Sequence, residues 1–189
     1  MANGNTYVDN DADLVRRLQN GDQGAFERLF EKHRRGMLAY SEKLVGERSL
    51  AEDIVQDCFV EFVEKIEGIN AERGASGWLY RVARNRSIDI LRRRKFEISR
   101  REGSQDNGHA GDGVVENNPA DGLMEKEMKA NAQTLLDTLP QKERDLLLLR
   151  FFGGLSFREI ADVLRRPLGT VLWQVQRSLR KLREIADEL

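Results

Sequence analysis

The stretch 102–122 most constrains how this chain of 189 residues folds. It reads EGSQDNGHAGDGVVENNPADG, which is rich in Gly, Asn and Asp and nearly free of apolar side chains. Such a segment buries too little apolar surface to offset the conformational entropy lost on ordering. We therefore expect a flexible tether over 102–122 and two separate bodies, residues 1–101 and residues 123–189.

Both bodies carry apolar residues at helical spacing, and no segment alternates as a strand does. Leu139-Pro140 marks a boundary within the second body, and Asp13 is the expected N-cap of the first helix. The expected helices cover roughly 11–35, 37–46, 50–67, 76–97 and 123–138, with a further helix over 141–151. The predicted fold class is all-α, with two helical domains joined by the tether.

The segment 156–183 predicts a helix, a tight turn and a second helix. Ser156 stands three residues before Glu159, which is the spacing of a reciprocal capping box. Pro167 ends the first helix, and Gly169-Thr170 is expected to supply a flexible joint and a hydroxyl cap for the next. Apolar residues then recur at helical spacing, at Val171, Val175, Leu179 and Leu182. This is the shape that enters a DNA major groove.

The second helix of this motif is basic, and no acidic residue lies between Arg165 and Arg183. The cations of the turn and the helix are Arg165, Arg166, Arg177, Arg180, Lys181 and Arg183. A solvated basic helix on an ordinary bundle would carry the same charge. The capped helix, the turn and the basic helix in this order favour DNA binding instead.

The net charge of −1 conceals a strong alternation along the chain. Residues 1–66 carry nine basic and thirteen acidic groups, whereas residues 73–101 carry ten and two. The sign reverses to four basic against ten acidic groups over 102–146, and returns to eight against two over 147–183. This pattern is typical of a protein that holds DNA at two places and presents an acidic face to another partner.

Several classes of protein are excluded by what the sequence lacks. The longest apolar run, 146–152, is interrupted by Arg150 and is too short to span a bilayer, and no apolar signal segment begins the chain. We expect a cytoplasmic protein without membrane insertion.

Cys58 is expected to be a small core residue, and His33 and His109 are too isolated to form a metal site with it. The sequence contains no nucleophile surrounded by arginines, no cluster of carboxylates that could bind a metal, and no phosphate-binding glycine loop. We therefore expect neither catalytic residues nor a cofactor.

The expected third helix has one apolar and one acidic side. The apolar stripe consists of Ile54, Val55, Cys58, Phe59, Phe62, Val63 and Ile66. The opposite side carries Glu52, Asp53, Gln56, Asp57, Glu61 and Glu64. Taken alone, this is a solvated acidic face.

The expected fourth helix combines aromatic rings with cations. Trp78 and Tyr80 lie close to reachable polar groups at Arg81, Arg84, Asn85, Arg92 and Lys95. Stacking rings beside positive charge suit a single nucleic-acid strand, although Trp78 and Tyr80 are more often partly buried packing residues, and packing is favoured for Trp78. The preceding loop, 70–77, is polar and carries Arg73, so it could receive an extruded base.

The order of these segments resembles an extracytoplasmic-function (ECF) sigma factor over nearly the whole chain. The resemblance rests on segments in register: 13–16 (DLVR), 21–22, 25–26, 51–57 (AEDIVQD), 78–85 (WLYRVARN), 139–140, 155–161 (LSFREIA) and 167–171 (PLGTV). It implies a sigma region 2 helical bundle over 1–101, a linker over 102–122 and a sigma region 4 helix-turn-helix domain over 123–189. It implies no bond chemistry.

The resemblance also implies partners and site residues. Core RNA polymerase, with its largest and second-largest subunits, is one implied partner, and a basic coiled coil of the largest subunit would bind the acidic third helix at Asp53, Gln56, Asp57 and Glu61. The minus-ten element, melted into single strands, would contact Arg73, Ser76, Trp78, Arg81, Arg84, Asn85 and Arg92. The minus-thirty-five duplex would contact Arg165, Arg166, Thr170, Trp173, Gln174, Gln176, Arg177 and Arg180. The tether would run toward the polymerase active-site channel, and an anti-sigma factor is a further implied partner.

The chain departs from the family pattern in the duplex-reading motif. Arg165 stands where the family usually has glycine, and Leu172-Trp173-Gln174 stands where a basic or small polar group and an arginine are common. Trp173 and Gln174 could make unusual base contacts, or Trp173 could pack on a partner. A rival hypothesis is a two-domain regulator that binds duplex DNA without a polymerase. It leaves the segment 78–85 and the acidic third helix without a role.

Overall fold

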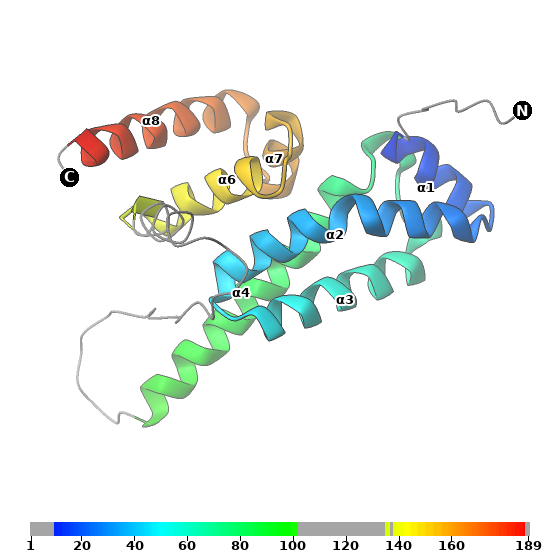
Figure 1. Ribbon diagram of the computed structural model, residues 1–189, viewed down its shortest axis with the longest axis horizontal. Coiled ribbons are helices and arrows are strands. Elements are labelled where there is room, and N and C mark those ends of the chain that lie inside the picture. The colour runs from blue at the N-terminus through cyan, green and yellow to red at the C-terminus, as the bar shows by residue number, and fades with distance from the viewer. Residues whose placement is uncertain (1–9, 102–134, 137, 188–189) are drawn as a thin grey trace, which may run out of the picture.

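The computed structural model describes residues 10–101, 135–136 and 138–187, and within these residues it is all-α, as predicted. The first domain contains α1 (Asp11–Gln19), α2 (Gln23–Val45), α3 (Arg48–Glu64), two short 3₁₀ turns (Ile66–Gly68 and Ala71–Arg73) and α4 (Ser76–Arg101). The second contains α6 (Gln141–Phe151), α7 (Phe157–Leu164) and α8 (Leu168–Asp187) (Figure 1). The expected tether and most of the expected helix over 123–138 lie outside the described residues. No described helix combines the length and apolarity needed to cross a bilayer.

The first two helices divide the sequence differently from the prediction. The expected helix over 11–35 is broken at Asn20–Asp22, where Gly21 adopts a positive φ of 86° and the Asp22 carboxylate accepts hydrogen bonds from Arg17 Nε and Nη2 at 2.9 and 2.6 Å. The N-cap of α1 is Asn10, whose side chain accepts from the Ala12 N–H at 3.3 Å, so the expected cap at Asp13 is wrong. Asp13 lies inside the first turn.

Gly36 does not break α2, contrary to the expected boundary near residue 36, and the helix runs unbroken from Gln23 to Val45. A Cβ at Gly36 would lie 2.5 Å from the Tyr80 hydroxyl oxygen and 3.0 Å from the Phe152 carbonyl oxygen. Glycine is required here because two other segments approach the helix backbone closely, and not because the helix ends.

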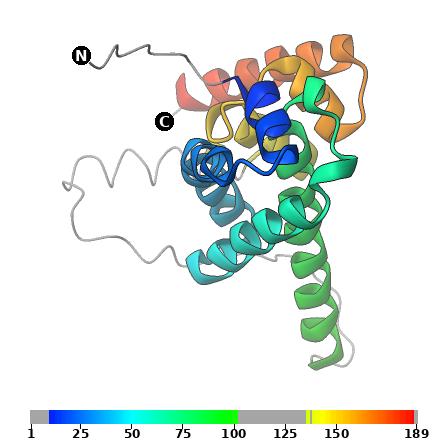
Figure 2. The same cartoon turned by 90° about the vertical axis from the view of Figure 1, so that its right-hand side faces the viewer.

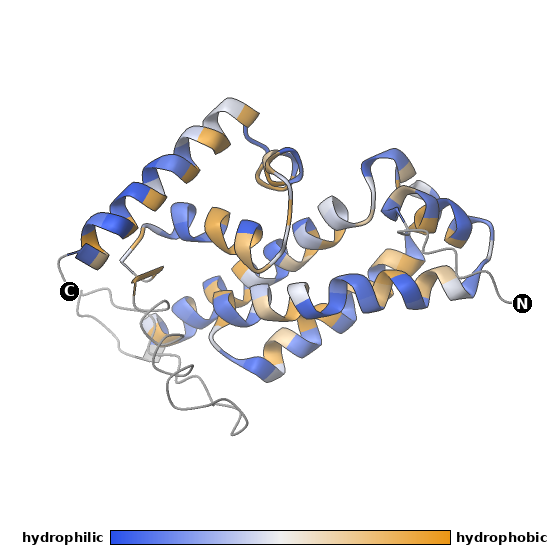
Figure 3. Ribbon diagram, turned by 45° about the horizontal axis from the view of Figure 1, so that its top comes forward, coloured by the Kyte–Doolittle hydropathy of each residue, from blue (hydrophilic) through white to orange (hydrophobic). Residues whose placement is uncertain are grey.

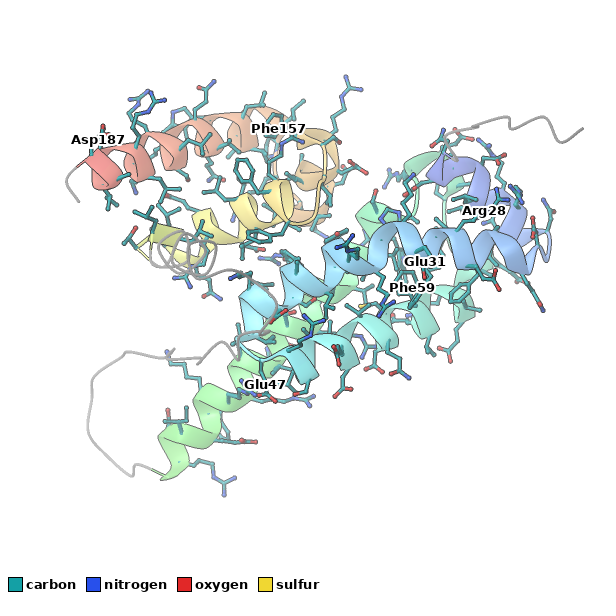
Figure 4. The ribbon with its side chains drawn as sticks, viewed as in Figure 1. Arg28, Glu31, Glu47, Phe59, Phe157 and Asp187 are labelled. Atoms are coloured by element: carbon teal, nitrogen blue, oxygen red, sulfur yellow. The ribbon has the colours of Figure 1, made fainter. Side chains whose placement is uncertain are left out.

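The core of the first domain lies where α3 packs on α2 and α4. Cys58 is fully buried, as expected, and burial raises the pKa of its thiol to about 12. Phe59 packs edge-on against Phe30 with 4.9 Å between the ring centroids, and Figure 4 labels it on the α3 surface facing α2. The predicted apolar stripe is wrong at Val63, which is 42% exposed, because Phe59 and Phe62 complete the contact surface of the last turns of α3.

The second domain confirms the predicted helix, turn and helix. Ser156 Oγ accepts from the Glu159 N–H at 3.3 Å, and Glu159 Oε2 accepts from the Ser156 N–H at 2.8 Å, which forms the expected capping box. Arg165 ends α7 in the left-handed conformation, with φ 53° and ψ 50°. A glycine would adopt this conformation without strain.

The start and the inner face of α8 differ from the prediction. The Val171 N–H donates to the Pro167 carbonyl at 3.1 Å, so helical bonding already begins at the proline. Gly169 and Thr170 lie within the first turn, and the expected flexible joint and Thr170 cap are wrong. Leu179 is 42% exposed, while Ser178 is buried and donates to Glu143 Oε2 at 3.4 Å, because a hydrogen bond to α6 stabilises the small polar residue at that position.

The two domains also pack on each other. Helix α4 contacts α7, and α2 contacts α6, as Figures 1 and 2 show from two directions. The buried side chains of both domains form one continuous apolar cluster. Helix α8 lies on the side of α6 away from α2 (Figure 1).

Candidate nucleic-acid and polymerase-binding surfaces

The acidic face of α3 is exposed to solvent at the predicted positions. Asp53, Gln56 and Asp57 are exposed, and Glu61 is half-buried. Arg86 of α4 reaches this face, with 2.7 Å from its Nη1 to the Asp57 carboxylate and 2.9 Å from its Nη2 to Glu61. Hydrogen bonds from Lys65 and Arg86 lower the pKa of Glu61.

Neutralisation of this face is therefore uneven. Within the described part of the chain, the Asp53 and Gln56 side chains have neither an ion-pair nor a hydrogen-bond partner. Arg48 pairs with Glu52 at 3.1 Å, and Arg86 and Lys65 largely neutralise Asp57 and Glu61, so the charge of Asp53 is left uncompensated between them. A basic partner would gain most electrostatic energy at Asp53.

An apolar hollow of about 640 Å³ adjoins this face between α2 and α3. Aromatic rings and two exposed valines form its walls, namely Phe26, Phe30, Phe59, Val60 and Val63, and its polar rim includes Arg34, Glu52, Gln56 and Glu64. Sequence reasoning missed this hollow. The one signal was Val60, an apolar residue among the acidic positions of α3, which is 53% exposed.

The predicted minus-ten residues on α4 and its preceding loop fall into two groups. Arg73 and Asn85 are exposed and Arg81 is half-buried, so these three side chains reach solvent. Arg92 is exposed and pairs with Asp89 at 3.1 Å. Trp78 is partly buried and packs edge-on against Phe62 with 5.4 Å between the centroids, so packing accounts for its position in this arrangement.

The remaining two, Ser76 and Arg84, are engaged by the second domain. Ser76 is buried, and its hydroxyl donates to Glu159, the same glutamate that caps α7. Arg84 Nε donates to Asp145 Oδ2 of α6 at 2.5 Å. Both side chains are therefore unavailable to a DNA strand while the domains are docked.

Asp145 is the centre of the contact between domains. Its carboxylate is 5% exposed, and the Tyr40 hydroxyl donates to Oδ1 at 2.7 Å while Arg84 occupies Oδ2. Burial, together with the nearby carboxylate, raises the pKa of Tyr40 well above its ordinary value. Sequence reasoning missed Asp145 and Tyr40, because an acid one residue before an apolar run carries no local signal.

A buried polar cluster anchors the loop before α4. Asp11 Oδ2 lies 2.8 Å from His33 Nε2 and accepts from the Ser76 N–H at 3.3 Å, while Asp11 Oδ1 pairs with Lys32 at 2.7 Å. Burial alone would raise the pKa of Asp11, but hydrogen bonds and charge from His33 and Lys32 outweigh it and hold the pKa well below its usual range. No group of metal-ligating residues is found among the described residues.

The predicted duplex-reading residues form the outer face of α8 and its preceding turn. Arg165, Thr170, Trp173, Gln176, Arg177 and Arg180 are exposed. The Arg177 guanidinium lies over the Trp173 ring, 5.2 Å from its centroid. Arg166 Nη1 donates to Gln174 Oε1 at 2.7 Å, so these two side chains are half-buried and joined. Figure 3 shows apolar residues interrupting the polar residues along α8.

Known proteins share both domains. Residues 29–97 match Sigma-70 region 2, and residues 129–182 match Sigma-70, region 4. The ECF RNA polymerase sigma factor SigW of Bacillus subtilis is 29% identical over 182 residues, which cover 93% of this chain and 96% of that protein.

Two solved structures share the fold. CnrH in complex with the cytosolic domain of CnrY has a TM-score of 0.70 at 21% identity, covering 95% of this chain and 99% of that one. The sigma factor RpoE in complex with the anti-sigma factor NepR from Bartonella quintana has a TM-score of 0.67 at 20% identity, covering 86% of this chain and 96% of that one. Both family matches fall on the helices described above, in the same order. The chain therefore belongs to the ECF sigma factor family and serves promoter-specific initiation of transcription with core RNA polymerase.

Proposed function

We propose that this sigma factor binds core RNA polymerase through α3 and holds promoter DNA at two separate basic surfaces. The observation that supports this most strongly is the distribution of charge over three surfaces. Cations gather on exposed parts of α4 and α8, whereas α3 presents uncompensated carboxylate at Asp53. Polymerase and DNA can then be bound at the same time without competing for one face.

In this proposal Asp53 and Gln56 carry most of the polymerase contact. Arg86 already satisfies Asp57 and Glu61, so a basic partner gains less there. The apolar hollow beside Gln56 would accept an apolar side chain of the same partner, since a charged rim around apolar walls is typical of protein-binding surfaces.

The proposal assigns the minus-ten strand to α4 and its loop, at Arg73, Trp78, Arg81, Asn85 and Arg92 together with Ser76 and Arg84. The minus-thirty-five duplex is assigned to α8 and its turn. Because Ser76 and Arg84 are bound to the second domain here, full strand capture requires the domains to separate. Polymerase would favour the separated arrangement by binding each domain at a different place.

The proposal includes an anti-sigma protein that inhibits the sigma factor by stabilising the docked arrangement. Its support is that a structurally similar sigma factor has been solved with the anti-sigma factor NepR. An inhibitor that touches both domains would stabilise their contact and keep Arg84 covered. The protein acts in the cytoplasm, where polymerase and promoters are located, and it performs no bond chemistry itself.

Charge reversal on α3 tests the polymerase contact. Asp53→Arg with Asp57→Arg should abolish co-purification with core RNA polymerase, whereas thermal unfolding should stay close to that of the wild type. The matched control is Glu27→Arg with Glu31→Arg, two exposed acids with the same spacing on α2, which should still co-purify. Figure 4 marks Glu31 on α2.

Transcription in vitro tests the whole proposal. The purified chain with core RNA polymerase should start transcripts at defined sites, and core polymerase alone should not. A chain that binds duplex DNA but never associates with core polymerase would instead be the two-domain regulator.

A further inference from the structure

We infer that Trp173 recognises the methyl group of a thymine in the minus-thirty-five duplex, and that Arg177 is a positioning residue for its ring. This inference rests on the proposed function, because it assigns a base chemistry to the same duplex-reading helix. It starts from an exposed aromatic ring at the centre of a basic surface.

The ring occupies the middle of the face of α8 that points away from the domain. Val171 and Val175 of α8 are buried and pack toward the domain interior. Residues three, four and seven positions from Trp173 share its face of the helix, and Thr170, Gln176, Arg177 and Arg180 are all exposed. A helix that enters the major groove with this face must bring the indole to the base edges.

The indole is exposed and yet held in place. Trp173 is 56% exposed, so most of its apolar surface has no cover within the described residues. The Arg177 guanidinium stacks on the ring, 5.2 Å from the centroid, and this cation–π contact restricts the rotation of both side chains. A ring kept rigid in solvent is prepared for burial against a partner, because little further side-chain entropy is lost on binding.

The chemistry of the major groove selects the partner. Adenine, guanine and cytosine are distinguished there by their hydrogen-bonding atoms, and thymine alone adds an apolar methyl group. Indole has one N–H donor and no acceptor, so it cannot form the bidentate pairs by which arginine or asparagine reads a base. The thymine methyl is therefore the group on a base edge that matches the ring.

The residues next to Trp173 are less suited to contact the thymine methyl group. Gln174, the other uncommon residue of the motif, accepts from Arg166 at its Oε1 at 2.7 Å, so it cannot form a bidentate pair with a base without first releasing Arg166. Arg165 and Arg180 flank the ring with positive charge that suits phosphates. The surface thus combines one apolar reader with cations that hold the duplex.

Replacement of thymine by deoxyuridine isolates the proposed contact, because the two bases differ only in that methyl. The full chain bound to core RNA polymerase first selects minus-thirty-five duplexes from a random pool, and each thymine of the selected site is then replaced by deoxyuridine. Wild-type protein should lose about fourfold in affinity at one or two positions, the equivalent of one buried methylene. Trp173→Ala should bind the thymine and deoxyuridine duplexes equally.

Three further variants control the experiment. Leu179→Ala removes an exposed apolar side chain from the flank of the same helix and should retain the wild-type preference. Arg177→Ala should reduce the preference for thymine as well as the overall affinity, because the ring loses its support. Thermal unfolding of each variant reports whether the domain stays intact, and Trp173→Phe, which keeps an aromatic ring, should retain part of the preference.

Equal binding of wild type to thymine and deoxyuridine at every position would overturn the inference while leaving the proposed function standing. So would a preference that survives in Trp173→Ala, or a Trp173→Ala defect confined to polymerase association, which would place the ring on a protein. If the complex selects no duplex at all, the proposed function itself fails.

Discussion

The contact of Asp145 with Arg84 should set how tightly the two domains dock. The perturbation is Asp145→Asn, which keeps the shape of the side chain and leaves an oxygen to accept from the Tyr40 hydroxyl. The substitution removes the negative charge opposite Arg84, whose Nε lies 2.5 Å from the carboxylate. Both domains should stay folded, since each retains its own buried apolar residues.

The expected loss in docking free energy follows from how deeply Asp145 and Arg84 are buried. A hydrogen bond between charged groups contributes about 1.5–3 kcal/mol. Removal of one partner of a fully buried pair costs about 3–5 kcal/mol, because the other charge is left without a partner. Arg84 is 23% exposed and can regain water, which favours the lower range. We expect a loss of about 2 kcal/mol in docking free energy, which is roughly a 30-fold shift toward separated domains.

The assay is single-molecule energy transfer between dyes on Glu27→Cys in α2 and Glu184→Cys in α8, both at exposed positions. The native thiol should not react, since burial raises the pKa of Cys58 to about 12. A double-mutant cycle with Arg84→Gln should show coupling near the full effect. As control, Glu72→Gln breaks an exposed pair with Arg16 and should leave the distance distribution unchanged. A shift below threefold, or additive single variants, would refute the reasoning.

Three other predictions concern backbone and charge. Gly36→Ala should lower the free energy of unfolding by about 1–3 kcal/mol, because the new Cβ would lie 2.5 Å from the Tyr80 hydroxyl oxygen. The control is Gly77→Ala, which should not destabilise the protein because nothing lies within 4 Å of the added Cβ. Thermal unfolding of both variants measures the difference. Because the pKa of Asp11 is lowered by folding, its stabilisation is present above the ordinary carboxyl pKa and is lost as pH falls below it, so the difference in unfolding free energy between wild type and Asp11→Asn should shrink from pH 7 toward pH 3. A difference that does not shrink would contradict this assignment. Arg165→Gly should raise the unfolding free energy by about 0.5–1 kcal/mol by relieving the left-handed φ, and should lower the salt dependence of duplex binding by about one phosphate contact, as titration at several salt concentrations would show.

The sequence alone determined those features whose physical cause is local. The capping box at Ser156 depends on neighbours three residues away, so their residue types were sufficient to predict it. The burial of Cys58 followed from the helical spacing of its neighbours. The candidate binding residues follow from the resemblance to ECF sigma factors, and their assignment to DNA and polymerase stays a prediction.

Tertiary structure decided the features that depend on distant residues. From the sequence, Gly36 predicts a helix break, but in the fold it lies within α2, where Tyr80 and Phe152 approach the helix backbone closely. Arg84 and Asp145 are 61 positions apart, and nothing near either residue indicates that they meet. Periodicity tells which face of a helix is buried, but the identity of the element that covers the face depends on packing of the whole chain. For this reason the sequence predicted two domains, and only the fold showed that one covers part of the other's candidate DNA surface.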